Sequence, residues 1–518
     1  MQRLLLKPTI FLSALSAPFV QTLAQEAKPA NKPNIIFILS DDHAYQAISA
    51  YGNRLINTPN IDRIADEGAL LRNNFVGNSI SGPSRATLLT GKYSHANGFK
   101  ENEKDAFNTD QLIIPDVLKE YGYQSAWIGK MHLETLPRGF DYWSILPGQG
   151  DYYNPDFITA PNDTIHFEGY VSDIITEQSL DWIEKRDDSK PFFLVIGHKA
   201  THRQWLPDLQ DLGAYDNIDF PLPENFYDDY VNRPAAADQD MTIEKTLDLK
   251  RDLKVHGDYV NHPSYNRFTA EQKKQFQAYY EGKITKEFEK LKLQGRKLTE
   301  WKYQRYLKDY YAVARSLDRN IGRVLDYLDK YGMTENTVVI YASDQGFYMG
   351  EHGWFDKRFM YEESVKTPFV IRYPGKIAPG TVNSDLISNI DWSPTILNIA
   401  GATIPNEIQG ESFLPLLTKE KTSDSWRDAT YYHYYEFPEP HHVYPHFGIR
   451  TKQYKLIRFY GPQDYWELYD LENDTSEMNN IYDEVSKELK QSLKSKLKDL
   501  MIKYSDWDAL KIFEQGVD

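Results

Sequence analysis

The segment Asn34–Tyr45, NIIFILSDDHAY, decides the class of fold. Its apolar run is followed at once by two aspartates, Asp41 and Asp42. A short, continuous apolar run that ends in polar residues is typical of a strand buried on both faces of a parallel sheet. The segment therefore predicts a sheet that is covered by helices on both sides.

The same pattern, a short apolar run followed by polar residues, recurs along the chain. Strand-like runs lie at 123–132 (YQSAWIGKMH), 191–202 (PFFLVIGHKATH) and 336–346 (NTVVIYASDQG). Apolar residues at helical spacing lie between them, for example from Val171 to Ile183 and from Tyr310 to Leu328. Alternating strands and helices predict an α/β fold with a large, mostly parallel sheet flanked by helices.

Two changes in the pattern of residue types along the chain predict the domain organisation. From about 207 to 307 the alternation gives way to charged, Tyr-rich sequence, which we interpret as a helical insertion in an α/β domain at 33–423. Residues 424–518 contain short aromatic runs separated by turn residues, and then an amphipathic helix at 485–504. This pattern predicts a smaller C-terminal α+β domain with an antiparallel sheet.

The N-terminus predicts export. Arg3 and Lys7 precede an apolar stretch from Ile10 to Val20, and small residues lead to Ala24. Residues 1–24 are typical of a signal peptide, and the run is shorter than the roughly 20 residues of a membrane-spanning helix. We therefore expect a periplasmic or secreted protein without stable membrane insertion.

Composition narrows the classes of partner. The 518 residues carry a net charge of −16, which argues against nucleic acid, and they include no cysteine, so disulfides and thiolate metal sites are excluded. Aromatic residues make up 14%, with 37 Tyr and 10 Trp. Some of these rings can be stacking surfaces for carbohydrate, although surface tyrosines are the more ordinary explanation.

Residues capable of chemistry follow four of the predicted strands. In an open parallel sheet, ligands bind beyond the carboxyl ends of the strands. One aspartate there is usually a turn or cap residue, and one histidine is usually structural. Four strand ends with such residues together indicate a functional site. The residues are Asp41, Asp42, Lys130, His132, His198, Lys199, His202, Asp344 and Gln345.

Three carboxylates and an amide form a set of hard oxygen donors. Oxygen donors from separated strands suit Ca²⁺ or Mg²⁺ better than Zn²⁺, and without a cation the carboxylates would repel one another. The sequence predicts one metal site made of Asp41, Asp42, Asp344 and Gln345.

A second motif is NSISGPSRATLLTGKY, at 78–93. Pro83 suits the first position of a helix, whose N-terminus together with Arg85 would attract an anion. From this segment alone, Ser81 or Ser84 could equally be a helix N-cap. The metal site, Arg85, Lys130, Lys357 and two histidines would together enclose a tetrahedral oxyanion, with Ser81 in the attacking position.

The motif SGPSRATLLTGK resembles the sulfatase signature, in which a Cys or Ser is followed by x-P-S-R and then by L-T-G. Segments before and after it, including NIIFILSDD, GYQSAWIGKMHL and WELYDLENDTSEMNNI, resemble sulfatase segments in the same order, over nearly the whole mature chain. The resemblance implies a formylglycine-dependent enzyme, with Ser81 converted by a serine-type maturase to an aldehyde whose hydrate attacks sulfur.

The resemblance also implies residue roles. Asp41, Asp42, Asp344 and Gln345 would bind one Ca²⁺, with Gln345 in place of the more usual Asn. Arg85, Lys130 and His132 would hold the hydrated aldehyde. His202 and Lys357 would contact the sulfate, and either could protonate the departing oxygen.

The strings HKATHRQW and HFGIRT resemble bacterial enzymes that act on 6-O-sulfated N-acetylglucosamine from glycosaminoglycans such as heparan sulfate, or from mucin glycans. We accordingly predict a sulfated oligosaccharide substrate, with Trp354, His446 and Arg450 as sugar contacts. The alternatives are a sulfatase for another glycosaminoglycan position, a related phosphatase or phosphonate hydrolase, and a non-catalytic glycan-binding protein with unmodified Ser81.

Overall fold

The computed structural model describes residues 32–102 and 104–515, and the predicted signal peptide at 1–24 lies outside this range. Within it, a ten-stranded sheet has the order β11-β2-β10-β9-β1-β8-β4-β5-β6-β7. Its strands are β1 (Asn34–Ser40), β2 (Ala69–Leu71), β4 (Gln124–Lys130), β5 (Tyr142–Leu146), β6 (Asp156–Thr159), β7 (Asp163–His166), β8 (Phe192–Gly197), β9 (Thr337–Ser343), β10 (Phe369–Arg372) and β11 (Thr381–Asn383).

The predicted α/β fold is confirmed. The central strands β9, β1, β8, β4 and β5 are all parallel, as the buried apolar runs require. Antiparallel pairs occur toward both ends of the sheet, where β10 pairs with β9 and with β2, and β6 pairs with β5 and with β7. The sheet is therefore mixed at its margins and parallel at the point where the predicted site lies.

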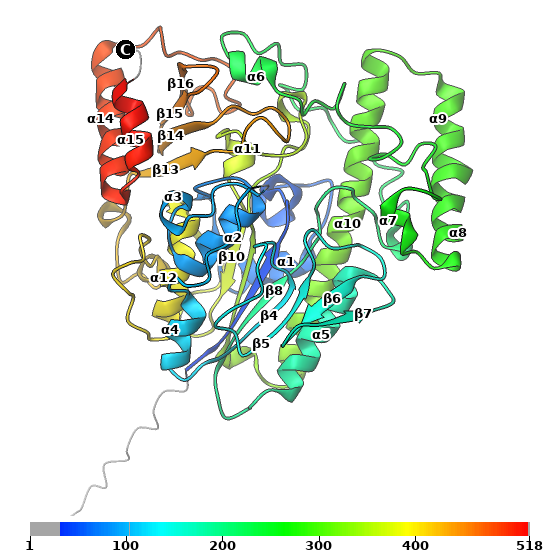
Figure 1. The fold of residues 1–518 in the computed structure, drawn as a ribbon, viewed down its shortest axis with the longest axis horizontal. Coiled ribbons are helices and arrows are strands. Elements are labelled where there is room, and N and C mark those ends of the chain that lie inside the picture. The colour runs from blue at the N-terminus through cyan, green and yellow to red at the C-terminus, as the bar shows by residue number, and fades with distance from the viewer. Residues whose placement is uncertain (1–31, 103, 516–518) are drawn as a thin grey trace, which may run out of the picture. The chain divides into compact units, whose positions relative to one another are not determined.

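Both faces of β1 are buried, and the two faces contact different helices. Ile36 and Ile38 belong to the apolar cluster of α1, α5 and α10, whereas Ile35, Phe37 and Leu39 belong to the cluster of α2, α4 and α12. Figure 1 shows α4 and α12 on one side of the sheet and α5 and α10 on the other. These helices are α1 (Pro59–Asp66), α2 (Ser81–Thr90), α4 (Ile114–Glu120), α5 (Val171–Lys185), α10 (Arg296–Lys330) and α12 (Trp392–Ile399).

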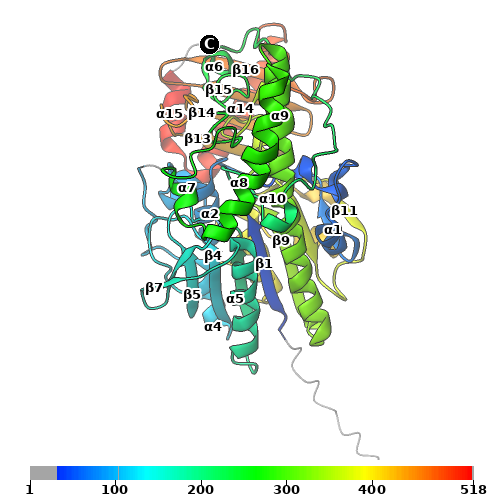
Figure 2. The ribbon, with the colours of Figure 1, turned by 90° about the vertical axis from the view of Figure 1, so that its right-hand side faces the viewer.

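The C-terminal region contains the predicted antiparallel sheet. Its order is β13-β14-β15-β16, and α14 contacts β13 and β14. Figure 2 shows this sheet beyond one end of the large sheet. The Tyr432 hydroxyl lies 2.6 Å from both Ser79 Oγ and the carbonyl oxygen of Arg358, so the small sheet is joined to loops of the large domain. The elements are β13 (Ala429–Tyr434), β14 (His446–Thr451), β15 (Tyr454–Phe459), β16 (Tyr465–Asp470), α14 (Lys487–Tyr504) and α15 (Trp507–Gln515).

The predicted insertion ends inside a helix. α10 runs without interruption from Arg296 to Lys330, so the expected boundary near 307 does not separate two structural units. Its first part packs with the insertion and its second part covers the sheet. The other insertion elements are α6 (Pro234–Asp238), α7 (Pro263–Asn266), α8 (Ala270–Tyr279), a π-helix (Tyr280–Thr285) and α9 (Lys286–Leu291).

Further short strands and α-helices lie between these elements. They are β3 (Asn74–Phe75), β12 (Ile387–Ser388), α3 (Ser94–Asn97), α11 (Glu362–Val365) and α13 (Leu414–Leu417). None of the helices in the described ranges is long and apolar enough to cross a membrane.

Candidate active site

The sheet brings the four predicted strand ends together. β9, β1, β8 and β4 are neighbours in this order, so the residues that follow them meet at one edge. Asp41 and Asp42 follow β1, and Asp344 and Gln345 follow β9. Lys130 is the last residue of β4. All five side chains are at most 1% exposed.

Ser81 is oriented toward this edge. Its hydroxyl donates to Asp41 Oδ1 at 2.9 Å, and it is the first residue of α2 rather than its N-cap. Ser84 is not a cap either, because its hydroxyl donates to the carbonyl oxygen of Asp344. Pro83 is the third helical residue, not the first as predicted. Neither serine is therefore explained by helix capping.

Gly82 allows the start of α2 to pack against Phe99. A Cβ at this position would collide with the ring of Phe99, so only glycine can follow Ser81 without a shift of the neighbouring loop. The backbone N–H of Gly82 donates to Asn102 Oδ1 at 3.0 Å. The glycine at the variable position of the signature thus has a steric reason in this fold.

Each buried carboxylate is paired with a basic side chain. Arg85 donates to Asp344 Oδ2 through Nε at 3.0 Å and through NH2 at 2.9 Å. Lys357 Nζ lies 2.7 and 2.8 Å from the two oxygens of Asp42. Lys130 contacts the oxygen of Asp41 that Ser81 does not use. Three positive and three negative groups therefore balance in a space closed to solvent.

Burial and neighbouring charges act on these groups in opposite directions. Burial raises the pKa of Asp42 to about 7 despite Lys357, and the carboxylates of Asp41 and Asp344 add to the increase. Burial would also raise the pKa of Asp41, but Lys130 and the other positive groups outweigh it and lower that pKa well below its usual value. The site is therefore at the limit of the negative charge that its own residues can stabilise.

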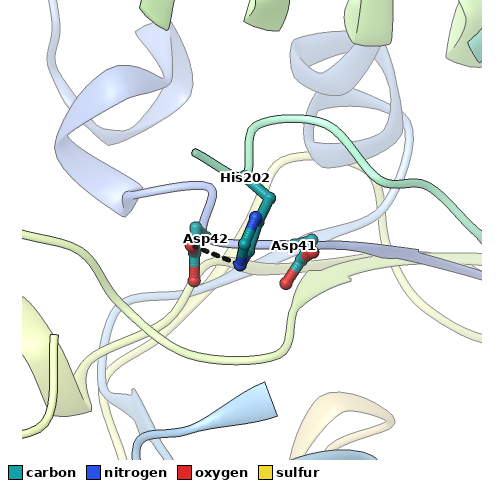
Figure 3. A group of neighbouring side chains, drawn as sticks. All are labelled: Asp41, Asp42 and His202. Atoms are coloured by element: carbon teal, nitrogen blue, oxygen red, sulfur yellow. Dashed lines mark ion pairs between the residues drawn. The ribbon is translucent and has the colours of Figure 1, made fainter. Parts of the chain in front are cut away.

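His202 lies beside the two aspartates, as Figure 3 shows. Its Nε2 is 3.9 Å from Asp42 Oδ2, and one ligand atom from each of Asp41, Asp42 and His202 lies within 4.8 Å of the others. Its Nδ1 is 2.5 Å from the carbonyl oxygen of Arg203, so Nδ1 carries the proton of the neutral ring and Nε2 faces the site. Burial lowers the pKa of His202 well below its usual value, as does Lys130.

The donor set fits a hard divalent cation. Asp41, Asp42 and Asp344 supply carboxylate oxygens, and Gln345 Oε1 is buried without a hydrogen-bond partner among the described residues. The amide nitrogen of Gln345 contacts Asp42, so rotation of the amide would turn its oxygen to that carboxylate. Oxygen donors without sulfur favour Ca²⁺ or Mg²⁺. His202 also reaches this group, which the sequence did not predict.

The sequence analysis missed Gln149, which connects three site residues. Its Oε1 accepts from Lys130 Nζ, and its Nε2 lies 3.1 Å from Nε2 of His132. Its backbone carbonyl accepts from Lys199 Nζ at 2.9 Å. Gln149 lies between two glycines just after β5, a strand that the sequence analysis did not predict. A polar residue between glycines at a strand end was the available signal.

The structure buries the three residues that were predicted as sugar contacts. Trp354 is fully buried, with its ring stacked on Tyr230 and Phe359. His446 is also fully buried, and its Nε2 accepts from the backbone N–H of Met360 at 3.1 Å. Arg450 is 8% exposed and pairs with Glu362 at 3.2 Å. His446 and Arg450 connect the small sheet to the large domain, and Trp354 packs within the large domain.

The C-terminal region reaches the site through another histidine. His441 Nε2 lies 3.4 Å from Asp356 Oδ2, next to Lys357. The backbone there is strained, because Asp356 and Arg358 have φ angles of 80° and 96°. Strain of this kind at a site that also holds buried charges is typical of functional segments.

The burial of His446 leads to a prediction about stability. Burial lowers its pKa to about 3, so the folded protein keeps the ring neutral while the unfolded chain protonates it near pH 6.5. The contribution of His446 to the free energy of unfolding is therefore fully present above pH 6.5, and it is lost as the pH falls from 6.5 toward 3. Between pH 7 and pH 5 we expect His446 to account for about 2 kcal/mol of lost unfolding free energy.

Urea unfolding at the two pH values measures this effect. His446→Gln keeps an acceptor for the Met360 N–H and does not titrate, so its stability should depend less on pH. His256→Gln is the control, because the side chain of His256 is 60% exposed. Equal pH dependence in His446→Gln and the unsubstituted protein would contradict the prediction.

The fold and the site together define a class of protein. The carboxyl ends of the parallel strands carry a buried hydroxyl and three aspartates. Lysine and arginine side chains around them suit a tetrahedral oxyanion. Enzymes that cleave esters of such anions with a divalent cation have these features.

Comparison with known proteins identifies the family. Residues 33–402 match the model of the sulfatase family, and residues 350–503 match that of the C-terminal part of N-sulphoglucosamine sulphohydrolase. The chain belongs to the sulfatase family, whose members hydrolyse sulfate esters and typically use formylglycine and a metal ion.

Individual relatives are similar over nearly the whole chain. An N-acetylglucosamine-6-O-sulfatase of Bacteroides thetaiotaomicron is 46% identical, over 97% of this chain and 92% of the relative. A protein solved in complex with its substrate D-glucosamine-2-N,6-O-disulfate has a TM-score of 0.89 and 47% identity, covering 92% of this chain and 99% of its own. A phosphonate monoester hydrolase of Agrobacterium radiobacter shares the fold, with a TM-score of 0.66 at 18% identity, over 92% of this chain and 96% of its own.

Proposed function

We propose that the protein hydrolyses sulfate esters of carbohydrates, with 6-O-sulfated N-acetylglucosamine from glycosaminoglycans or mucin glycans as its substrate. The observation that carries the proposal is the position of Ser81. Its hydroxyl is held by Asp41 at an edge that also presents Arg85, Lys130 and Lys357. The two relatives of 46% and 47% identity, one named for this activity and the other bound to a 6-O-sulfated glucosamine, support the substrate.

The balance of charge explains why the site would select a sulfate ester. Three buried aspartates are neutralised by Arg85, Lys130 and Lys357, so the residues alone have no excess positive charge. A divalent cation held by Asp41, Asp42, Asp344 and Gln345 would leave a surplus of two positive charges. Lys130 and Lys357 could then turn from the aspartates to the oxygens of an anion.

Each remaining residue has a role in the proposed reaction. Formylglycine at position 81 would supply the hydrated-aldehyde nucleophile, and a calcium ion would supply charge for the sulfate oxygens. Arg85, Lys130 and His132 would hold the group at position 81. Lys357 and His202 would bind the sulfate from the opposite side.

We assign proton donation to His202. Its Nε2 faces the site, and its pKa is held low by burial and by Lys130. A bound sulfate ester brings negative charge next to the ring, which favours its protonated form. Protonated Nε2 can then donate to the departing sugar oxygen.

The sugar ring of the substrate would bind next to Lys357. Asp356 and His441 lie there, whereas the three residues predicted as sugar contacts are buried. Carboxylate and imidazole groups can hydrogen-bond to sugar hydroxyls. We therefore propose this pair for sugar recognition.

Gln149 is proposed as a positioning residue for Lys130 and His132. Gln149→Ala removes both contacts and should lower kcat on the order of tenfold to a hundredfold, with a smaller change in KM, because misplaced groups lose catalytic power. Gln149→Glu keeps an acceptor for Lys130 but offers no donor to His132, and so separates the two contacts. Gln210→Ala, at a glutamine bonded to Asp208, is the control. An unchanged kcat in Gln149→Ala would contradict the assignment.

A panel of sulfated sugars tests the substrate. The protein is made in a host with a serine-type maturase, and sulfate release is measured from N-acetylglucosamine 6-sulfate, from sugars sulfated at other positions, and from a phosphate ester. We expect the highest kcat/KM for the 6-sulfate. Faster release from another position would support a different sulfatase specificity, and release of phosphate alone would support the phosphatase alternative. Binding without release would support the glycan-binding alternative.

A further inference from the structure

A groove outside the active site lies on α14, the long helix that packs on the outside of the C-terminal sheet (Figure 1). Its volume is about 700 Å³. One face of α14 forms its side, and Tyr482 of the loop before α14 and Phe513 of α15 complete it. The apolar residues under α14 belong to a different cluster from those between the small sheet and the site loops. The groove is therefore separate from the active site.

A row of lysines lines this groove. Lys487, Lys490, Lys494 and Lys498 recur every three or four residues and so share one face of the helix. At 1.5 Å per residue, the row extends for about 16 Å. The lining contains one acidic residue, Asp483, whereas the whole chain has a net charge of −16. The row is thus a local surplus of positive charge on an acidic protein.

Three of these lysines have no ion pair within the described residues. Lys498 pairs with Glu514 at 2.8 Å, but no carboxylate of the described chain lies within 4.0 Å of Lys487, Lys490 or Lys494. A groove of about 860 Å³ beside α10 is different, because its Arg319 and Arg323 both pair with carboxylates. Of these two grooves, the α14 groove therefore has fewer basic groups paired with carboxylates of the described residues.

Aromatic rings support the lysines instead. Lys490 Nζ lies 4.4 Å from the ring centre of Tyr482, and Lys494 Nζ lies 4.7 Å from that of Trp466. The two rings are stacked at 6.0 Å with an interplanar angle of 9°. A ring face attracts an ammonium group without neutralising its charge, so these lysines stay able to bind an anion.

We propose that the α14 groove is a second binding site for sulfated polysaccharide. The ligand class rests on the proposed function, and the groove adds a place where a longer chain is held outside the catalytic site. A row of point charges spread over this length matches repeated sulfate groups better than a single anion. Binding at two places raises the effective concentration of chain ends at the active site.

A triple variant with a matched control tests the proposal. Lys487→Gln, Lys490→Gln and Lys494→Gln are combined in a Ser81→Ala background that stops turnover. Lys274→Gln, Lys286→Gln and Lys290→Gln on α8 and α9 form the control, with the same change in charge at exposed lysines. The probe is a heparin-derived oligosaccharide, with its desulfated form for comparison, and affinity is measured by calorimetry at two salt concentrations.

We expect about tenfold weaker binding in the α14 variant, a smaller salt dependence, and no change in the control. Equal loss in both variants, unchanged binding in the α14 variant, or equal affinity for the desulfated probe would overturn the proposal. Binding of the α14 row to anionic lipid vesicles but not to the oligosaccharide would also overturn it.

The two proposals can fail separately. Turnover of N-acetylglucosamine 6-sulfate by the α14 variant with Ser81 intact should be unchanged. Normal turnover together with unchanged heparin binding would reject the second site alone. Loss of heparin binding in the α14 variant, with no turnover even in the unsubstituted protein, would support the groove and reject the proposed activity.

Discussion

Replacement of Ser81 by Ala should abolish sulfate release. The variant lacks the hydroxyl that donates to Asp41 and the carbon that would become the aldehyde. Loss of a nucleophile typically lowers turnover on the order of 10⁴-fold or more, because the surrounding groups have no reaction left to assist. The measurement is sulfate release from N-acetylglucosamine 6-sulfate under conditions that are saturating for the unsubstituted protein.

Two controls make this result specific. Peptide mass spectrometry of residues 73–85 should show that the active protein has lost about two daltons at Ser81, the two hydrogens removed on oxidation. Ser81→Cys retains a residue that the family also converts, so in a host with a cysteine-type maturase it should regain turnover. Full activity of a preparation in which Ser81 is entirely unmodified would contradict the mechanism.

Removal of the divalent cation should have the second largest effect. Asp42 contacts Lys357 and Gln345 and has a pKa raised by burial, so it is the carboxylate most in need of a cation. We expect chelation to abolish turnover and Ca²⁺ to restore it. Asp42→Asn removes one negative charge and should lower both Ca²⁺ affinity and kcat, the latter on the order of 10³-fold.

Calcium binding can be measured without activity. Ca²⁺ at a hundred times its dissociation constant should raise the unfolding free energy of the chelator-treated protein by about 2.7 kcal/mol, and calorimetry should show one site. In Asp42→Asn both effects should be much smaller. Asp326→Asn, at an aspartate that is 74% exposed on α10, is the control. Equal Ca²⁺ stabilisation of Asp42→Asn and the unsubstituted protein would contradict the predicted ligand set.

The active-site residues were predictable because they follow local patterns. Asp41, Lys130 and Asp344 lie at the ends of strands whose apolar runs are visible in the sequence. The carboxyl ends of neighbouring parallel strands must meet at one edge, so the residues at these ends come together in any sheet of this kind. The strands beyond β4 were less predictable, since β5, β6 and β7 are shorter than the central strands before them.

The residues of the C-terminal region were not predictable in the same way. His446 and Arg450 lie on one strand, β14, and nothing in their local sequence indicates which face of the small sheet meets the large domain. The sheet buries both of them against α11 and its neighbouring loop, and places His441 of the preceding loop beside Asp356. Packing between segments far apart in the chain decides which of these side chains is reachable.

The sequence by itself therefore determined the α/β fold, the sulfatase family and the central set of polar residues, because these depend on the period of apolar residues and on short motifs. Only the tertiary structure decided that Trp354, His446 and Arg450 are buried, that Gln149 connects Lys130 with His132, and that α14 places lysines beside aromatic rings. These properties depend on which surfaces pack together, and burial and charge pairing across such surfaces arise only in the folded chain.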